Sequence, residues 1–585
     1  MNPSTALGRV LVDELIHAGV TDVVLCAGSR NAPLSLAVSD AERDGRLRLH
    51  VRLDERTAGF LALGLARATG RPAAVVTTSG SAVVNLHPAV VEAHHDGVAL
   101  VLLTADRPPW LRGVGANQVI DQRSVFGAEL RFFTEFAVAG RQAGQVAGWR
   151  ATVDRAVAQA RGAGGRPGPV QLNVPLSEPL LPDLDDGTEA WPEPLSGNPR
   201  RPGVWTELRF ESTSDVFDRE PAVPAAEPGE KVLYIAALTS SWAARVARAG
   251  GLVISEAGGL AGPDVIPGGV AVLDAGVPAE LRPDRVIVLG RPTLFRGVSR
   301  LLADSAVVVD VVGDPSWYPD PAARARVVAP GLPSPTPSPP AWAGAWRAAG
   351  RAAVAAQERV LAEVADGPIA SARLARELTR VLPADSTLLL GSSQPPRDIG
   401  RFAVVRPDIR VVANRGVAGI DGLVSTAVGV ALGTDGPTVA LLGDLTLLHD
   451  HTGLMIGPLD RRPDLAIVIS SNDGGAIFGG LESGDEQHAH AFERVFGTPH
   501  GVSIRELAAA TGCDYRSVEA AAGDDLAVAL ADALDGVRGI RIVEVPTGRA
   551  DVRGLSRRTS AEVGDAVREA LPSAGMRTSP SRAEG

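Results

Sequence analysis

Residues 438–450 read TVALLGDLTLLHD, and residues 465–478 read LAIVISSNDGGAIF. Each stretch opens with an apolar run of strand length, and Asp444 follows the first run as Asn472 follows the second. Short apolar runs that end in polar loops and alternate with helical patterns are typical of parallel sheets buried on both faces. The spacing of Asp444 and Asn472 matches a strand, a helix and the next strand, so we expect both side chains at one edge of the same sheet.

The same alternation extends along most of the chain and predicts an α/β protein with three doubly wound parallel-sheet domains. In the first group the expected strands are 23–27, 49–53, 73–77, 100–104 and 170–174. In the second group they are 232–236, 252–255, 285–289 and 306–311. In the third group they are 387–390, 409–412, 438–442, 466–469 and 540–545.

Changes in composition divide the chain between these groups. A chain of 585 residues has room for roughly three domains. Residues 182–230 are rich in Pro, Glu, Asp and Gly, and residues 330–340 contain PSPTPSPP, which predicts an extended segment. We therefore expect an N-terminal domain at 1–185, a linker and central domain at 186–345, a C-terminal domain at 346–555 and a flexible tail at 556–585.

The bulk properties exclude several classes of function. A formal net charge of -11 argues against nucleic acid and anionic membranes as partners. No apolar run is long enough to insert in a membrane, and Asp13 and Glu14 interrupt the first apolar stretch, so we expect a cytoplasmic protein. Cys26 and Cys513 form neither a disulfide framework nor a cysteine metal site. Lys231 is the only lysine, which leaves little room for Schiff-base chemistry.

Asp444 and Asn472 carry the hard oxygen donors that an octahedral Mg²⁺ or Mn²⁺ prefers. A backbone carbonyl of the NDGG turn, at Gly474, and a water would add to them, and the oxygens of a diphosphate would complete the coordination. Glycines in that turn would let the backbone approach phosphates. The alternative interpretation is structural, with Asp444 capping a helix and Asn472 in a turn.

A second candidate, Glu55, lies in LDERTAGFLALGLA at residues 53–66, where an expected strand ends and a helix begins. The alternative for Glu55 is a carboxylate that only stabilises the helix N-terminus. The loops after other expected strands carry further polar residues: Ser29, Arg30, Arg107, Asn117, Gln118, Ser393, Arg397 and Arg415. Arginines that converge at strand ends suit substrates with several carboxylates, whereas each one alone is more often part of a surface ion pair.

The strings TADRPP, GANQ, NRGVAGIDG and GDLTLLHD occur in this order, and SNDGGAIF follows them. Together they resemble the 2-succinyl-5-enolpyruvyl-6-hydroxy-3-cyclohexene-1-carboxylate synthases, a thiamine-diphosphate-dependent family of menaquinone biosynthesis. The general thiamine-diphosphate pattern is GDG followed by NN, and the departures to GDL and ND match this branch. The resemblance is closest over about residues 28–122 and 391–478, and the domain order agrees over about residues 1–555.

The resemblance implies a transferase that decarboxylates 2-oxoglutarate and adds the succinyl group to isochorismate by conjugate addition. It implies a pyrimidine-binding N-terminal domain, a diphosphate-binding C-terminal domain and a dimer or tetramer in which Glu55 contacts the cofactor of another chain. The implied cofactor-binding residues are Glu55, Ser393, Ile420, Gly443, Asp444, Leu445, Asn472, Gly474, Gly475 and Ile477, with Mg²⁺ or Mn²⁺ on Asp444, Asn472 and the Gly474 carbonyl. The implied substrate-binding residues are Ser29, Arg30, Arg107, Asn117, Gln118, Arg296, Ser393, Arg397, Arg415, Ile477 and Phe478.

Two other classes remain open from the sequence. One is a different thiamine enzyme, such as an acetolactate-type synthase or an oxoacid decarboxylase, although no GxGxxG fingerprint follows a strand in the middle of the chain. The other is a non-catalytic protein that kept the fold as a binding module. His94 and His95 lie outside the matched loops, so we interpret them as structural, and no histidine is required by the expected chemistry.

Overall fold

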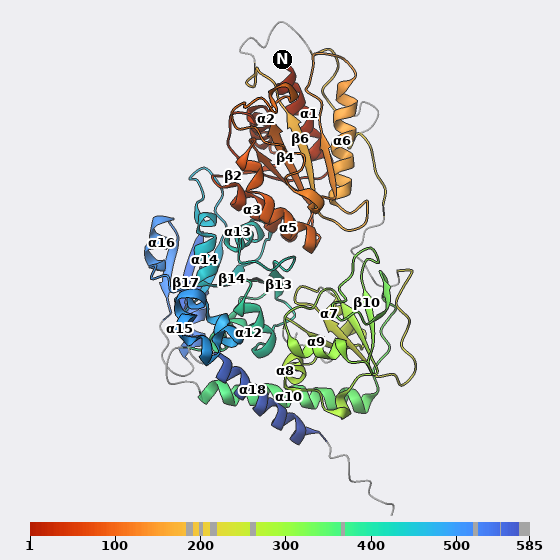
Figure 1. Ribbon diagram of the computed structural model, residues 1–585, viewed down its shortest axis with the longest axis vertical. Helices are drawn as coiled ribbons and strands as arrows, with labels where there is room; N and C mark the ends of the chain where they lie inside the picture. The colour runs from red at the N-terminus through yellow and green to blue at the C-terminus, as the bar shows by residue number, and fades with distance from the viewer. Residues whose placement is uncertain are drawn as a thin grey trace, which may run out of the picture.

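A computed structural model describes residues 1–182, 191–197, 203–210, 219–240, 242–257, 265–363, 369–518, 525–549 and 552–571. These residues form three sheets in which every strand pair is parallel, as the sequence predicted (Figure 1). Parts of the expected linker at 186–230 and the end of the expected tail, 572–585, lie outside the described residues. None of the described helices has the length and apolarity needed to cross a membrane.

The N-terminal sheet has the strand order β2-β1-β3-β4-β6-β5. Its strands are β1 Asp22–Cys26, β2 Arg48–Arg52, β3 Ala73–Thr77, β4 Leu100–Asp106, β5 Phe132–Glu135 and β6 Pro169–Pro175. Its helices are α1 Pro3–His17, α2 Ala32–Arg43, α3 Glu55–Thr69, α4 Ser81–Val84, α5 His87–Asp96 and α6 Gln145–Ala160. Apolar residues of α1, α2 and α6 cover one face of the sheet, and those of α3 and α5 cover the other.

The central sheet has the order β11-β10-β9-β7-β8. Its strands are β7 Val232–Ala236, β8 Leu252–Ser255, β9 Arg285–Leu289, β10 Val308–Val312 and β11 Ala325–Ala329. Its helices are α7 Ala243–Arg248, α8 Gly269–Ala275 and α9 Arg296–Ala303. The loops at the carboxyl ends of β8 and β9 are joined by a hydrogen bond from the Leu294 amide to Glu256. They face the C-terminal domain, where a Cβ atom on Gly400 would lie 2.5 Å from the carbonyl oxygen of Glu256.

The C-terminal sheet has the order β13-β12-β14-β15-β17-β16. Its strands are β12 Thr387–Leu390, β13 Arg410–Ala413, β14 Thr438–Gly443, β15 Leu465–Ser471, β16 Asp514–Ser517 and β17 Ile540–Pro546. Its helices are α11 Ser371–Val381, α12 Gln394–Phe402, α13 Leu423–Gly433, α14 Asp444–His449, α15 Ala489–Phe492, α16 Ile504–Ala510 and α17 Asp525–Leu534. The chain order reverses between β12 and β14, which is where ligands bind in sheets of this kind.

The sequence missed β5, β11 and β16, each of which is the last strand at one edge of its sheet. An edge strand is covered less completely than a central one, so it lacks the continuous apolar run by which the buried strands were recognised. β16 reads DYRS and is mostly exposed, and β5 is only half-buried along its length.

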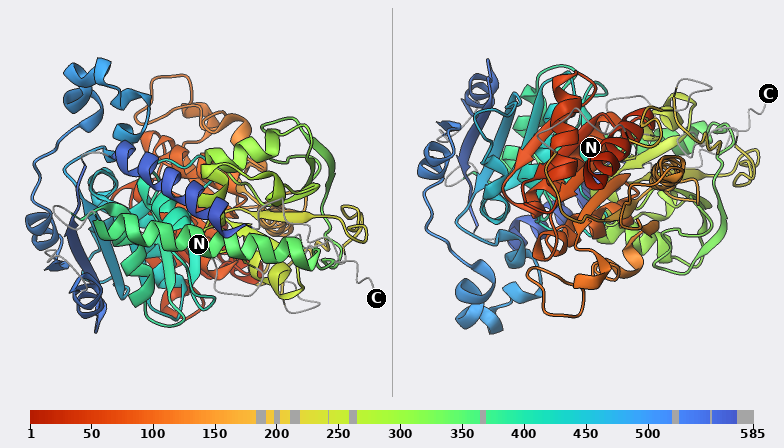
Figure 2. Two further views of the ribbon diagram at one scale, coloured as in Figure 1. Left: turned by 90° about the horizontal axis from the view of Figure 1, so that it is seen from below. Right: turned by 90° about the horizontal axis from the view of Figure 1, so that it is seen from above.

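Two long helices, α10 Pro340–Glu363 and α18 Val552–Ala570, lie across one another beneath the central and C-terminal domains (Figure 2, left). The boundary expected after residue 345 therefore falls inside α10. The flexible tail expected from residue 556 is also corrected, because α18 is helical as far as Ala570 and buries Thr559, Val563 and Val567. These three residues recur every fourth position and form the single apolar stripe of an otherwise polar helix.

The N-terminal and C-terminal domains pack together through α3 and α13 (Figure 1). Residues of both helices belong to one buried apolar cluster, which includes Leu61, Leu65 and Val428. This contact places the first turn of α3, where Glu55 lies, beside the segment that follows α14. Arg56 donates to the carbonyl oxygen of His449, and the hydroxyl groups of Thr57 and Thr452 lie 3.0 Å apart.

Candidate active site

Asp444 and Asn472 meet at one edge of the C-terminal sheet, as the sequence predicted. β14 and β15 are parallel neighbours with Gly443 opposite Ser470, so the residues after them are adjacent. The Oδ2 atom of Asp444 accepts hydrogen bonds from the amide nitrogens of Asn472, at 2.8 Å, and Gly474, at 3.2 Å. Its Oδ1 atom accepts one from Leu445 at 2.7 Å. The carboxylate, only 1 % exposed, is thus held by three backbone amides.

The geometry of this pair fits a divalent cation. A carboxylate offers about four acceptor positions, so three amide donors leave one position, on Oδ1, for a further partner. The Oδ1 atom of Asn472 is buried and has no hydrogen-bond partner, which calls for a ligand that binds oxygen. No described group of three or more His, Cys, Asp and Glu side chains could hold a metal. A cation here would need the Asn oxygen and a backbone carbonyl beside the single carboxylate.

The turn after Asn472 is packed so tightly that only glycine fits. Gly474 has φ of +145°, and a Cβ atom there would lie 1.9 Å from the carbonyl oxygen of Gly497. Gly475 donates its amide hydrogen to the same carbonyl at 2.7 Å. Arg549 donates to the carbonyl oxygen of Asp473 at 2.8 Å and so closes the turn from β17. The turn is therefore clamped by residues far away in the sequence.

Glu55 is the first residue of α3, at the carboxyl end of β2. Asp54 caps the helix by accepting the amide hydrogen of Arg56 at 2.9 Å, which leaves Glu55 in the first turn. Within the described part of the chain, the Glu55 carboxylate forms no hydrogen bond or ion pair. It lies near the end of β1, where its charge adds to burial in raising the pKa of the Cys26 thiol. Glu55 is thus positioned and available for an outside partner.

Two of the predicted N-terminal residues share a network with Ser79, which the sequence analysis did not select. Ser79 follows β3, donates its hydroxyl hydrogen to the carbonyl oxygen of Gln118 at 3.0 Å and accepts from Arg107. Gln118 has a positive φ of 58° and donates from Nε2 to the Ser79 carbonyl at 2.8 Å. Burial, and then the nearby charge of Arg30, lower the pKa of Arg107. Several donors therefore gather at the carboxyl ends of β1, β3 and β4.

The remaining members of this set differ in how they are held. Arg30 donates to the carbonyl oxygen of Leu176 at 2.9 Å and is mostly buried. Ser29 and Asn117 are exposed on the loops next to it. Among the described residues, no hydrogen bond or ion pair joins this N-terminal set to the Asp444 site or to the arginines of the C-terminal domain. Within one chain the two halves of the predicted site are therefore not linked by polar contacts of the described residues.

Arg397 and Arg415 lie beside each other where the C-terminal and central domains meet. Burial, followed by the positive charges of Arg415 and Arg401, lowers the pKa of Arg397. A bound carboxylate would offset this concentration of positive charge. Arg415 donates to the hydroxyl oxygen of Thr293 at 2.8 Å. Ser393 stands at the start of α12 with φ of 80° and accepts from Arg397 through its carbonyl oxygen.

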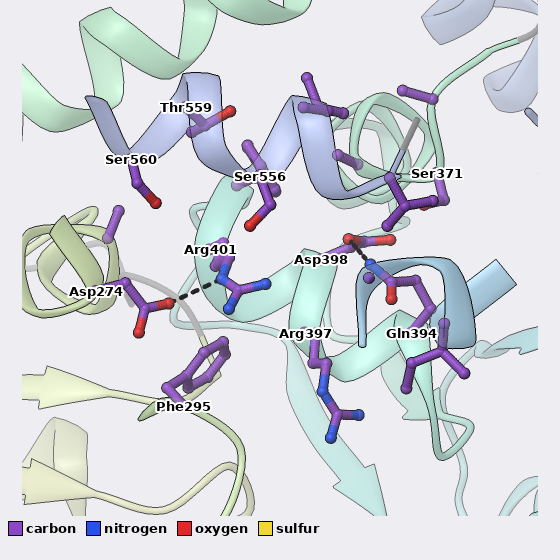
Figure 3. A pocket seen from close by; sticks show the side chains of 18 of the residues that line it. Asp274, Phe295, Ser371, Gln394, Arg397, Asp398, Arg401, Ser556, Thr559 and Ser560 are labelled. Atoms are coloured by element: carbon purple, nitrogen blue, oxygen red, sulfur yellow. Dashed lines mark hydrogen bonds and ion pairs between the residues drawn. The ribbon is translucent and has the colours of Figure 1, made fainter. Parts of the chain in front are cut away.

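A cavity of about 630 Å³ opens beside Arg397 between α8, α9, α12 and α18. In Figure 3 the Arg397 side chain points away from the Gln394–Asp398 pair, whereas Arg401 turns toward Asp274, to which it donates at 2.9 Å. Ile477 and Arg296 also line this cavity. Arg296 is 73 % exposed and lies at the rim of the cavity, where its guanidinium forms an ion pair with Glu482 at 2.9 Å. The cavity joins several of the predicted substrate residues.

Phe478 and Ile420, two further predicted residues, differ in their surroundings. Phe478 is 36 % exposed, and its ring centroid lies 5.7 Å from that of Phe496. Ile420 is half-buried in the loop before α13. A Cβ atom at the neighbouring Gly422 would lie 1.9 Å from the ring of Phe60, so this loop sits directly on α3.

Known proteins resemble this chain over its whole length. Residues 5–125 match the family model described as thiamine pyrophosphate enzyme, N-terminal TPP binding domain. A 2-succinyl-5-enolpyruvyl-6-hydroxy-3-cyclohexene-1-carboxylate synthase of Saccharopolyspora erythraea is 48% identical over 97% of this chain and 100% of its own length. Synthases of the same name from Nocardia farcinica and Thermobifida fusca are each 44% identical, over 96% and 97% of this chain and 100% of their own length.

The chain belongs to this synthase family. Membership confirms the resemblance seen in the sequence and makes the protein a thiamine-diphosphate-dependent enzyme. The match of the family model lies within the N-terminal domain, where Glu55, Arg30 and Arg107 gather at one sheet edge.

The structure adds residues to the candidate site that sequence reasoning missed. Glu92 on α5 accepts the amide hydrogens of Gly416 and Val417, at 2.6 and 2.8 Å, and so fixes the NRGVAG loop from the other domain. His500 lies with its Nε2 atom 3.5 Å from Oδ2 of Asp444. The sequence signal for Glu92 was weak, because α5 also carries His87, His94, His95 and Asp96. His500 had none, because a contact across 56 residues leaves no local pattern. His94, by contrast, is structural as expected and contacts the Glu129 carbonyl oxygen at 2.8 Å.

Proposed function

We propose that the chain catalyses the thiamine-diphosphate-dependent decarboxylation of 2-oxoglutarate and transfers the succinyl unit to isochorismate in menaquinone biosynthesis. The product is the compound for which the relatives are named. The observation that carries the proposal is 44–48% identity to those synthases over nearly the full chain. The positions of Asp444, Asn472 and Glu55 at the ends of strands support it. When bound, thiamine diphosphate supplies the carbanion chemistry that no protein side chain provides.

We infer that Asp444, Asn472 and the Gly474 carbonyl hold Mg²⁺ or Mn²⁺, which would bind the diphosphate. The free acceptor position of Asp444 and the unpartnered Oδ1 of Asn472 support this assignment. Gly443 and Leu445 flank the carboxylate at the start of α14, whose N-terminus favours negative charge. Gly475 lets the backbone of the turn approach phosphate oxygens closely.

We infer that Glu55 would accept a hydrogen bond from the aminopyrimidine of a bound cofactor and would hold the proton at its own carboxylate. Its carboxylate has no competing partner in the described part of the chain, and Asp54 fixes the helix turn that presents it. Ile420, which lies on the loop that rests on α3, would support the bent cofactor between the two domains. No histidine is needed to move the proton at this point.

We infer that the arginines bind the carboxylates of the two substrates. Arg397 and Arg415 would hold one acid at the domain junction, with Ser393, Ile477 and Phe478 beside it. Arg30 and Arg107 would hold the other from the N-terminal domain, with Ser29, Asn117 and Gln118. Arg296 would reach the substrate only after release from Glu482, so we assign it a place at the rim.

We infer that the active unit is at least a dimer, because no hydrogen bond or ion pair of the described residues joins the two halves of the site within one chain. Glu55 of one chain would then serve the Asp444 site of another. Two leucines on the surface near Glu55 are strongly exposed: Leu53 is 85 % exposed and Leu459 is 100 % exposed. The two flank a contact in which Val51 donates to Asp460 at 2.8 Å. Such a patch is costly to leave in water and suits a second copy.

The direct test is carbon dioxide release from 2-oxoglutarate with thiamine diphosphate and Mg²⁺, measured with and without isochorismate. Release that depends on isochorismate and consumes its absorbance is the expected result. Release that ignores isochorismate would indicate an oxoacid decarboxylase instead. No release with either substrate would contradict the proposal.

A further inference from the structure

The metal-site turn is built together with a distant segment, residues 493–502. The side chain of Asp473 accepts the amide hydrogens of both His500 and Gly501 at 2.9 Å. The Gly497 carbonyl accepts from Gly475, and Arg549 ties the Asp473 carbonyl to Glu493. His500 is therefore held in place by the residues on either side of Gly474.

The proton of the His500 ring is fixed by a backbone contact. The amide of Val502 donates to Nδ1 of His500 at 3.0 Å. Because Nδ1 accepts a hydrogen bond, the neutral ring must carry its proton on Nε2. The Nε2 atom is buried and has no hydrogen-bond partner, although the side chain as a whole is 13 % exposed. A buried donor without an acceptor requires an explanation.

Asp444 is not that acceptor. Its Oδ2 atom lies 3.5 Å from Nε2 and already accepts two amide hydrogens, which fill its two acceptor positions. Asp473 lies on the Nδ1 side of the ring, at 3.7 Å. The donor is therefore directed at the Asp444 site but satisfied by neither carboxylate there.

Two buried polar atoms at the Asp444 site thus have no hydrogen-bond partner, and one is an acceptor while the other is a donor. Oδ1 of Asn472 is an acceptor and requires a cation or a donor, whereas Nε2–H of His500 is a donor and requires an anion. A metal ion paired with a diphosphate supplies both at once. We propose that His500 is a cofactor-binding residue whose Nε2–H donates to an oxygen of the diphosphate. The inference rests on the proposed assignment of the metal and diphosphate to Asp444 and Asn472.

A diphosphate-binding role for His500 predicts effects on binding that a purely structural role does not. A donor to a charged oxygen contributes more than a neutral hydrogen bond, so its loss should weaken binding of the diphosphate about ten- to hundredfold. Binding of inorganic pyrophosphate with Mg²⁺ should weaken by the same factor, because it occupies the same subsite. Glutamine places an N–H group at nearly the reach of Nε2 and should recover part of the affinity, whereas alanine should not.

The experiment measures thiamine diphosphate binding by titration calorimetry at fixed Mg²⁺ for the full chain and for His500→Ala, His500→Gln and His490→Ala. His490 is exposed in the preceding segment and serves as the matched control. Competition by pyrophosphate and the melting temperature without cofactor are measured for each protein. The expected order of affinity is parent and His490→Ala, then His500→Gln, then His500→Ala, with similar melting temperatures.

Equal affinity of His500→Ala and the parent would overturn the inference. Equal weakening of the Gln and Ala variants, with lowered melting temperatures, would also overturn it, since that result marks a purely structural residue. If the parent itself fails to bind thiamine diphosphate, the proposed cofactor site fails first, so the two failures are told apart.

Discussion

Gly64 of α3 and Gly429 of α13 face each other at the crossing of the two helices, and neither has room for a side chain. A Cβ atom on Gly64 would lie 2.3 Å from the carbonyl oxygen of Thr426, and one on Gly429 would lie 2.3 Å from that of Leu61. The atoms in the way belong to the backbone, so they cannot move aside cheaply. This crossing sets the position of α3 and hence of Glu55 at its first turn.

Replacing Gly64 with alanine should force the helices apart and lower the free energy of unfolding by about 1–3 kcal/mol. Activity should fall further than stability, because the displacement is passed along α3 to Glu55. Gly344→Ala is the control: this glycine lies in α10 with nothing within 4 Å of an added Cβ, and the change should be neutral or slightly stabilising. Thermal unfolding and turnover of both variants check the prediction. Normal turnover in Gly64→Ala would contradict it.

The contact between α3 and α13, together with the sites near it, shows how much of the structure could be predicted from the sequence. Asp444 and Asn472 were predictable because each directly follows a buried strand, and neighbouring parallel strands bring such residues to one edge. Glu55 was predictable from the start of a helix after β2, although β2 itself is only partly buried. The glycines of the crossing were visible only as small residues in apolar helices. Nothing local says that the two helices meet, since they are separated by more than three hundred residues.

The other contacts that the sequence did not predict also join residues that are far apart in the chain. Glu92, Ser79 and His500 act on loops that are brought to them by the fold, so their roles cannot be inferred from their neighbours in the chain. α18 was missed for a different reason. Its buried stripe, formed by Thr559, Val563 and Val567, is only one residue wide. The rest of the helix is polar, which is typical of a solvated tail.

Gly474→Ala should abolish tight, metal-dependent binding of thiamine diphosphate. The new Cβ atom would collide with the carbonyl oxygen of Gly497, and the backbone at φ of +145° is strained for any L side chain. The turn must shift, which moves both the Gly474 carbonyl and Asn472 away from Asp444. A loss of affinity of about tenfold or more is expected by titration calorimetry.

Gly501→Ala is the matched control for this turn. Gly501 also has a positive φ, of 59°, but an added Cβ would meet nothing within 4 Å. The control therefore carries backbone strain without the collision, and it should bind the cofactor nearly as the parent does. If both variants lose affinity equally, strain in the loop rather than the close approach to Gly497 decides the effect.

Glu256 should make the stability of the protein depend on pH. Burial, opposed by hydrogen bonds from Leu294 and its neighbours and by the charge of Arg415, raises the pKa of this carboxyl from 4.5 to about 7. A raised pKa means that the contribution to stability is complete below pH 4.5 and is lost as the pH rises through 7. Glu256→Gln cannot ionise, and its amide oxygen can still accept from Leu294.

The melting temperature of Glu256→Gln relative to the parent should therefore rise steadily between about pH 5 and pH 8. Glu569→Gln, at an exposed position on α18, is the control for the substitution itself. Differential scanning calorimetry across this range checks both. A constant difference for Glu256→Gln would mean that the carboxyl is ionised throughout.

Glu55→Gln should lower turnover about 100- to 10,000-fold while leaving the fold and the metal site intact, because the amide cannot take up the proton that the carboxylate holds. Asp444→Asn should also be inactive, for a different reason: it weakens the cation site. If Glu55 serves the site of a partner chain, the two inactive variants complement one another. A mixed dimer then contains one site with both residues intact and one site with both replaced.

Co-expression of the two variants with different tags, followed by purification on both tags, isolates this mixed dimer. Its activity should approach roughly half that of the parent, because one of its two sites is intact. Each variant alone gives the baseline. Activity at that baseline in a confirmed mixed dimer would place Glu55 and Asp444 of the same chain in one site.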